Sequence, residues 1–95
     1  MLKSEPDDVF LHYALALAYI AEGDHQTGLQ RLSQVIDRDP KYVSAYFQKG
    51  QILAEQGDSE TARKTITRGI EVARDVGDAH AEAEMTAFLE TLSSL

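Results

Sequence analysis

The 95-residue chain contains no cysteine, and basic residues are scarce in it. Without cysteine it can form no disulfide and can carry out no thiol chemistry. This composition fits a reducing compartment, so we expect a cytoplasmic protein. Nine Lys and Arg residues stand against 16 Asp and Glu residues, which gives a net charge of -7. Contacts with phosphates require clustered Lys and Arg, so we expect no nucleic-acid partner.

The chain also lacks a long hydrophobic run. Its most apolar stretch extends from Val9 to Ala21 and is interrupted only by His12. A membrane-spanning helix requires about 20 apolar residues, and a secretory signal requires a positively charged leader. The stretch is too short for the first, and Glu5, Asp7 and Asp8 precede it. We therefore predict a buried helix here and no membrane partner. The hydrophobic content of 43% is typical of a folded globular domain, and we expect one domain over residues 1–95.

Proline and glycine are few, but their positions repeat. Ala21-Glu22-Gly23-Asp24 returns as Glu55-Gln56-Gly57-Asp58, a step of 34 positions, and Pro6 and Pro40 keep the same step. Glycine at such a turn ends a helix in the left-handed conformation. The aspartate after it can cap the next helix by accepting from its first free N–H groups. Each Gly-Asp pair therefore indicates a helix before it and a helix after it.

The spacing of apolar residues agrees with this interpretation. It predicts five helices, at about Asp7–Glu22, His25–Arg38, Lys41–Gln56, Ser59–Arg74 and Ala79–Thr91. No proline follows the fourth helix at the 34-residue step, so we expect its end to fray. The last helix has one apolar face and one face that carries Glu82, Glu84 and Glu90. Such a helix is typical of the terminal cap of a repeat stack.

The first helix has two apolar faces. One consists of Leu11, Leu15, Ala18 and Tyr19, and the other of Phe10, Tyr13, Leu17 and Ile20. A helix that is apolar nearly all round requires cover on both sides. We expect the first set to supply the core and the second set to stay exposed until a ligand helix, a preceding repeat or a second copy of the chain covers it. The alternative is that the fold packs the second set against Phe47.

This 34-residue helix–turn–helix unit, with small residues, aromatics and a closing proline, resembles the tetratricopeptide repeat. The resemblance covers about residues 6–76 and rests on Leu15, Tyr19 and Pro40 in the first copy and on Gly50 and Ala62 in the second. His12 replaces the family's frequent Trp, Lys49 departs from an apolar position, and the second copy lacks the closing proline. The resemblance implies an all-α fold, a right-handed α-solenoid fragment. Its repeats would span about 7–40 and 41–75, with a capping helix at about 78–93.

Small residues support this fold independently of the resemblance. Ala16, Gly28, Gly50 and Ala62 would let paired helices approach at the short end of the usual spacing of about 8–10 Å. The two glycines each cost a helix about 1 kcal/mol, and close packing is the expected compensation.

No group of residues predicts catalysis, a cofactor or a metal ion. His80 and Glu84, four residues apart, are predicted to form a solvated pair on one helix face. The basic cluster Arg63, Lys64 and Arg68 is predicted to be a solvated outer face. The sequence lacks a glycine-rich phosphate loop and a serine in a strand-to-helix turn. We therefore expect a protein that is not an enzyme.

In the resemblance, the first helix of each repeat lines a concave groove in which ligands bind. The corresponding residues are Phe10, Tyr13, Leu17, Ile20, Phe47, Gln51 and Glu55. The family's clamp of Lys, Arg and Asn for a peptide's terminal carboxylate is absent, because the chain has no Asn. We expect a scaffold that binds a protein or peptide through an apolar groove. The alternative is a self-association module, most simply a homodimer joined through Phe10, Tyr13, Leu17 and Ile20.

Overall fold

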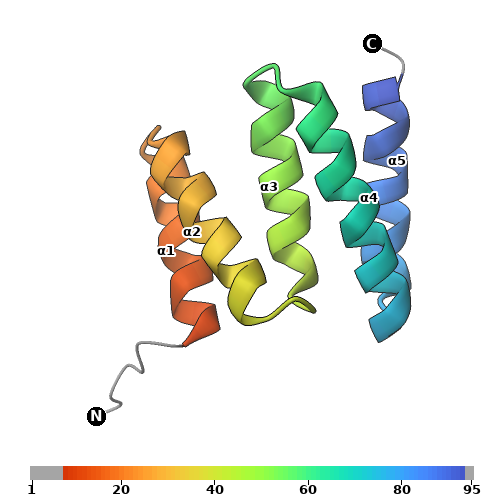
Figure 1. Cartoon of the computed structure of the whole chain (residues 1–95), viewed down its shortest axis with the longest axis horizontal. Helices are drawn as coiled ribbons and strands as arrows, with labels where there is room; N and C mark the ends of the chain where they lie inside the picture. The colour runs from red at the N-terminus through yellow and green to blue at the C-terminus, as the bar shows by residue number, and fades with distance from the viewer. Residues whose placement is uncertain (1–7, 94–95) are drawn as a thin grey trace.

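The computed structural model describes residues 8–93, and within this range every regular element is helical. Figure 1 shows five helices: α1 (Val9–Ala21), α2 (His25–Arg38), α3 (Val43–Glu55), α4 (Ser59–Val76) and α5 (Ala79–Ser93). The all-α prediction is confirmed, and the helix ends differ from the expected ones by at most two residues. The lead-in with Pro6, and the predicted start at Asp7, lie outside the described residues.

The turns have the predicted chemistry. Gly23, Gly57 and Gly77 adopt φ values of 89°, 87° and 78°. The next residue's N–H then closes the turn on a carbonyl five residues back, as Asp58 N does with Leu53 O at 3.0 Å. Four aspartates accept from a backbone N–H three residues ahead of them and so cap the helices that follow: Asp8, Asp24, Asp58 and Asp78.

The expected fraying of α4 is wrong. This helix continues to Val76 and ends sharply at Gly77, and Asp78 N donates to Ala73 O at 2.8 Å. The missing proline lets α4 run past the position where α2 stops, and a glycine supplies the stop instead. The longer α4 also shifts the start of α5 relative to the 34-residue repeat. The N-cap residues Asp8 and Tyr42 of α1 and α3 lie 34 positions apart, but Tyr42 and the α5 cap Asp78 lie 36 apart.

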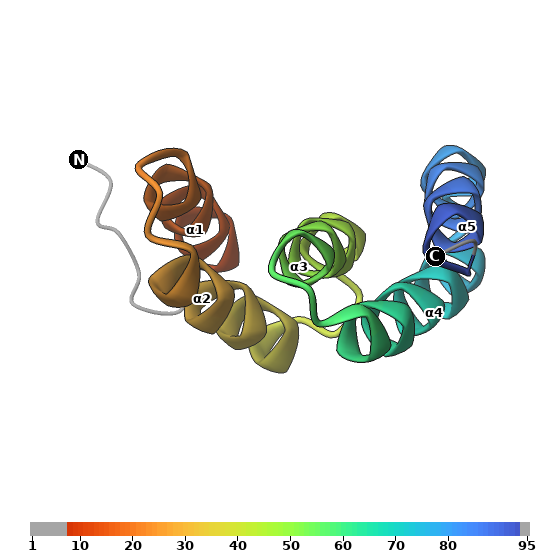
Figure 2. The ribbon, with the colours of Figure 1, turned by 90° about the horizontal axis from the view of Figure 1, so that it is seen from above.

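The helices form two rows along a curved arrangement. Figure 2 shows α1, α3 and α5 along the inner side of the curve and α2 and α4 along the outer side. Successive helices pack on each other, and α3 also contacts α5. The chain measures 48 × 31 × 18 Å. This elongated shape is expected of a short stack of helix pairs, in which each unit contacts only its neighbours.

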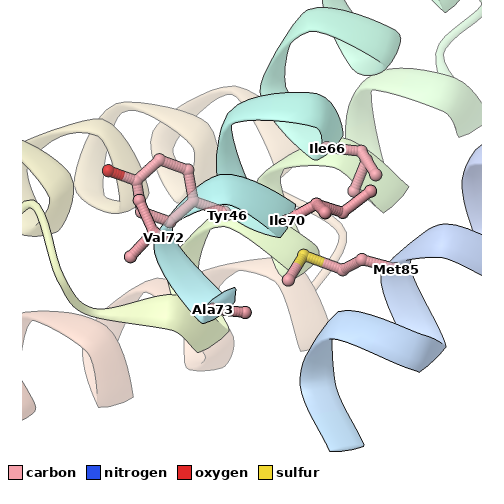
Figure 3. Packing of buried hydrophobic residues seen from close by; sticks show 6 residues of the cluster. All are labelled: Tyr46, Ile66, Ile70, Val72, Ala73 and Met85. Atoms are coloured by element: carbon pink, nitrogen blue, oxygen red, sulfur yellow. The ribbon is translucent and has the colours of Figure 1, made fainter. Parts of the chain in front are cut away.

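The core consists of three clusters that follow one another along the stack. The first joins α1, α2 and α3 through Ala16, Leu32, Val35 and Ala45. The second, drawn in Figure 3, joins α3, α4 and α5 through Tyr46, Ile66, Ile70, Val72, Ala73 and Met85. The third contains Leu53, Ala62 and Leu92. Tyr46 is 4% exposed, and its hydroxyl donates to Pro40 O at 2.7 Å, which satisfies the one polar atom of this side chain.

The prediction of close packing at the small residues is confirmed. A Cβ atom on Gly28 would lie 2.5 Å from Cγ1 of Ile20, and one on Gly50 would lie 2.5 Å from Cγ1 of Ile66. Gly69 is a third site of this kind, which the repeat pattern did not predict. A Cβ there would lie 2.7 Å from both Tyr46 Cβ and Met85 Sδ, so this glycine lets three helices meet.

The assignment of the core face of α1 is wrong. Leu11 and Leu15 are 36% and 37% exposed, whereas Tyr13 and Ile20 pack with Ala16 against α2 and α3. The reason is that α1 is apolar nearly all round, so its own pattern does not mark an inward side. The close contact of Ala16 and Ile20 with Gly28 of α2 determines the rotation of the helix.

Candidate binding surface

The inner row of helices carries most of the predicted groove residues, and Tyr13 connects two of these helices. Its ring centroid lies 5.0 Å from that of Tyr42, at the start of α3. Burial raises the pKa of Tyr13, and hydrogen bonding toward the side chains of Ser44 and Gln48 in α3 opposes that rise. Tyr13 therefore stabilises the contact between α1 and α3 as well as forming part of the surface.

Phe47 lies 34 positions after Tyr13 and also contacts the next inner helix, here α5. Its ring meets that of Phe88 in α5 edge to face, with centroids 5.8 Å apart and an interplanar angle of 67°. Aromatic pairs in this arrangement contribute about 0.5–1.5 kcal/mol beyond the area that they bury. Tyr13 and Phe47 are therefore half-buried between neighbouring inner helices.

The other predicted residues divide between core and surface. Ile20 points toward Gly28 and packs with the first core cluster, so it is structural. Phe10 is 68% exposed, the largest exposure among the large hydrophobic residues of the described range 8–93. Leu17 and Gln51 are half-buried, and Glu55 is exposed. Leu17 follows Tyr13 by one helical turn, and Gln51 follows Phe47 by one turn, so both continue the inner face.

Phe88 also reaches the inner surface, although it is not among the predicted groove residues. The 34-residue register could not have placed it on the groove, because α5 starts two positions late relative to that register. The aromatic residue itself was the available signal. The inner surface thus combines aromatic rings and Leu17 with the polar groups of Ser44, Gln48 and Gln51. Such a surface can bury apolar side chains of a ligand and hydrogen-bond to its backbone.

The outer face of α4 has a different character. Arg63, Lys64 and Arg68 are exposed, as expected for a solvated face. With Thr67 and Glu71 they line an open hollow of about 350 Å³. Arg68 pairs with Glu71 at 3.0 Å, and this hydrogen bond raises the pKa of Arg68. Exposed pairs of this kind contribute little to stability.

The predicted solvated pair of His80 and Glu84 is confirmed. His80 Nε2 lies 3.4 Å from Glu84 Oε2, and both side chains are largely exposed. Within residues 8–93, no group of three or more His, Cys, Asp or Glu residues is arranged to hold a metal ion. None of the helices in this part of the chain has the length and apolar character that a membrane crossing requires.

Comparisons with known proteins agree with the repeat architecture. The model of the tetratricopeptide repeat family matches residues 19–84, well over half of the chain. A TPR repeat-containing protein of Pseudomonas aeruginosa is 33% identical over 92 residues, which cover 97% of this chain and 88% of that protein. A tetratricopeptide repeat and J domain-containing co-chaperone of Cryptococcus neoformans is 28% identical over 91 residues. This chain spans only 16% of that protein's length.

Solved structures show the same fold. The solution NMR structure of a tetratricopeptide repeat domain protein from Salinibacter ruber matches with a TM-score of 0.91 at 27% identity, covering 97% of this chain and 93% of that one. A crystal structure of a tetratricopeptide repeat domain protein from Salinibacter ruber gives a TM-score of 0.87 at 27% identity, with 93% and 98% covered. The family match, the relatives and the helix arrangement lead to one conclusion: the chain belongs to the tetratricopeptide repeat family.

Proposed function

We propose that the chain is a scaffold that binds a peptide or a helix of another protein on the inner face of α1, α3 and α5. Folds of this family generally mediate protein–protein interaction. The observation that carries the proposal is the inner face itself, where Leu17, Gln51 and the Phe47–Phe88 pair stay partly accessible. The co-chaperone relative is compatible with a protein partner.

The chemistry of this face favours a ligand with apolar side chains. Tyr13, Leu17 and Phe47 offer apolar surface, while Gln51 can hydrogen-bond to the ligand's backbone. Glu55 adds a negative charge at the end of α3, which favours a ligand without acidic groups there. We propose no role for catalysis or for a cofactor, because the inner face holds apolar side chains and amides rather than a nucleophile beside a base.

The test is to select peptides from a random library on the intact chain and to measure the affinity of a labelled peptide so obtained. Leu17→Asp should weaken binding at least tenfold, about 1.4 kcal/mol, because it places a charge on the apolar surface. Gln34→Asp, on the exposed side of α2, introduces the same charge and should leave the affinity within about twofold. Equal affinities for the two variants would contradict the proposal.

A folding control accompanies this measurement, because Leu17 is half-buried. Circular dichroism should show native helix content in Leu17→Asp. If that variant loses helix content, Glu55→Lys serves instead, since Glu55 is exposed and its replacement alters the surface without disturbing the core. Loss of fold in Leu17→Asp together with unchanged affinity in Glu55→Lys would mean that this face is core rather than binding surface.

Self-association is the second candidate function. A specific observation favours it: most of the exposed large hydrophobic side chains, Phe10, Leu11 and Leu15, belong to α1. Apart from Phe10, these residues differ from the ones predicted for a homodimer contact. The molecular mass in solution distinguishes this candidate from a scaffold that stays monomeric.

A further inference from the structure

Helix α1 presents an outer face that differs from every other exposed helix surface in the structure. Between Val9 and Ala21 the helix contains no Asp, Glu, Lys or Arg. Five exposed apolar residues follow one another at intervals of one or three positions and therefore share one side: Phe10, Leu11, Ala14, Leu15 and Ala18. We call this set the α1 outer face. Contiguous apolar patches of this kind on soluble proteins mark interaction sites.

The internal repeat shows how the same side of a helix is used elsewhere in this chain. Moving 34 positions along, Leu11 corresponds to Ala45 and Ala18 to Ile52 in α3. Ala45 is 0% exposed and Ile52 is 4% exposed. Ala45 packs in one cluster with Leu32 and Val35 of α2, so the preceding helix covers this side of α3. Leu11 and Ala18 thus stand at helix-packing positions of the repeat, whereas Phe10, Ala14 and Leu15 correspond to the exposed Ser44 and the half-buried Gln48 and Lys49.

The two ends of the stack are chemically unequal. Figure 2 shows α1 at one end of the inner row and α5 at the other. The exposed residues of α5 include His80, Glu84 and Glu90, together with Thr86 and Thr91. A head-to-tail contact would bury these charged and polar groups against the apolar α1 outer face, which is unfavourable unless each finds a partner. Because the α5 end packs poorly on the α1 outer face, contact between the α1 ends of two copies is favoured.

The distribution of charge also favours a second copy of the chain as the partner of the α1 outer face. The chain carries a net charge of -7, so two copies repel each other at most orientations. The uncharged α1 outer face is a surface on which two copies can meet without placing like charges opposite each other. In a two-fold contact each copy uses the same patch, and an apolar helix face is complementary to itself.

We propose that the α1 outer face docks on the same face of a second copy, forming a two-fold symmetric dimer of the chain. The proposal rests on the second candidate function, self-association, and is independent of the peptide site. The contact uses the side of α1 away from Tyr13 and Ile20, and it borders the inner surface only where Phe10 lies two turns before Leu17. A dimer of this kind offers two peptide sites, which would strengthen binding to a partner that carries two ligand segments.

The experiment is sedimentation equilibrium of the full chain up to about 1 mM, the concentration that detects weak dimers. The mass should rise from 10.5 kDa toward twice that value and then level off. The double substitution Leu11→Gln and Leu15→Gln should raise the dimer Kd at least tenfold. The matched control is Val76→Gln in α4, where an apolar side chain of similar exposure, 44%, should be replaceable without effect. Circular dichroism checks that all three proteins keep their helix content.

Several results would overturn the proposal. A wild-type chain that stays monomeric at about 1 mM would contradict both self-association and the assignment of the α1 outer face as its contact. A dimer that the double variant weakens no more than Val76→Gln does would retain self-association but refute the assignment to α1. A mass that continues to grow beyond the dimer would indicate head-to-tail stacking instead. The peptide-binding test stays distinguishable through Glu55→Lys, because Glu55 lies on α3 and outside the α1 outer face.

Discussion

The side chain of Ile66 occupies the space that a Cβ atom on Gly50 would require. Cγ1 of Ile66 lies 2.5 Å from that position, well inside van der Waals contact. Ile66 itself is 0% exposed, so it lies enclosed in the core. This contact joins α3 to α4 and compensates for the helix propensity that glycine loses in the middle of α3.

Gly50→Leu should therefore destabilise the fold by about 1–3 kcal/mol or more, because the added side chain overpacks the interface of α3 and α4. The control is Gln34→Leu on the exposed side of α2, which should change the free energy of unfolding by less than about 0.5 kcal/mol. Urea denaturation followed by circular dichroism measures both. Equal unfolding midpoints would show that the helix pairing described above is wrong.

The aspartate caps provide a second prediction. Asp58→Ala removes the side chain that accepts from Thr61 N at 3.2 Å and should cost about 0.5–2 kcal/mol. Asp37→Ala removes an equally acidic side chain from the exposed face of α2, away from the start of that helix, and should cost less than about 0.5 kcal/mol. Thermal unfolding of the two variants at one pH measures the difference. The capping role of Asp58 is contradicted if the two melting temperatures shift equally.

The third prediction concerns Tyr46 and alkaline pH. Burial raises the pKa of Tyr46 above 10.0, and the nearby Arg68 opposes that rise. In the folded chain Tyr46 therefore keeps its proton to a higher pH than in the unfolded chain. Its contribution to stability is complete below about pH 10 and is lost as the pH rises through the folded-state pKa. Burial also raises the pKa values of Tyr13 and Tyr42, so the whole chain should lose stability in this range.

Tyr46→Phe isolates one part of this effect. At neutral pH it should cost about 0.5–1.5 kcal/mol, because Pro40 O loses the hydrogen bond from the tyrosine hydroxyl. The difference in unfolding free energy from the wild type should shrink above about pH 10, since the variant cannot ionise at this position. Urea denaturation at pH 7 and at about pH 10.5 measures it. A difference that stays constant between the two pH values would mean that Tyr46 titrates alike in both states.

Features that depend on local chemistry were predictable from the sequence. Gly23 and Gly57 predicted left-handed turns, and Asp24 predicted a helix N-cap, because each residue acts on the backbone within a few positions. The close contacts at Gly28 and Gly50 were also predictable, since two copies of the pattern agreed in register. The same reasoning missed Gly69, whose packing against Tyr46 and Met85 depends on a third helix.

Features that depend on which side of a helix faces inward were harder to predict from the sequence. Helix α1 has apolar residues on every side, so Leu11 and Leu15 were assigned to the core although they are exposed. Phe88 was not assigned to the inner surface because the extension of α4 to Val76 shifts α5 relative to the repeat. The positions of Tyr13 and Phe47 on the inner row followed from the repeat, but their contacts with the neighbouring helices required the structure.

The proposal that the inner face of α1, α3 and α5 binds a protein segment is tested most directly by mapping a bound peptide on the chain. The measurement is a titration of the isotope-labelled full chain with a library-selected peptide, followed through backbone amide chemical shifts. The largest changes should occur at the inner residues Leu17, Gln51 and Phe88. Changes confined to the outer residues of α2 and α4, such as Gln34 and Arg63, would contradict the proposed binding face.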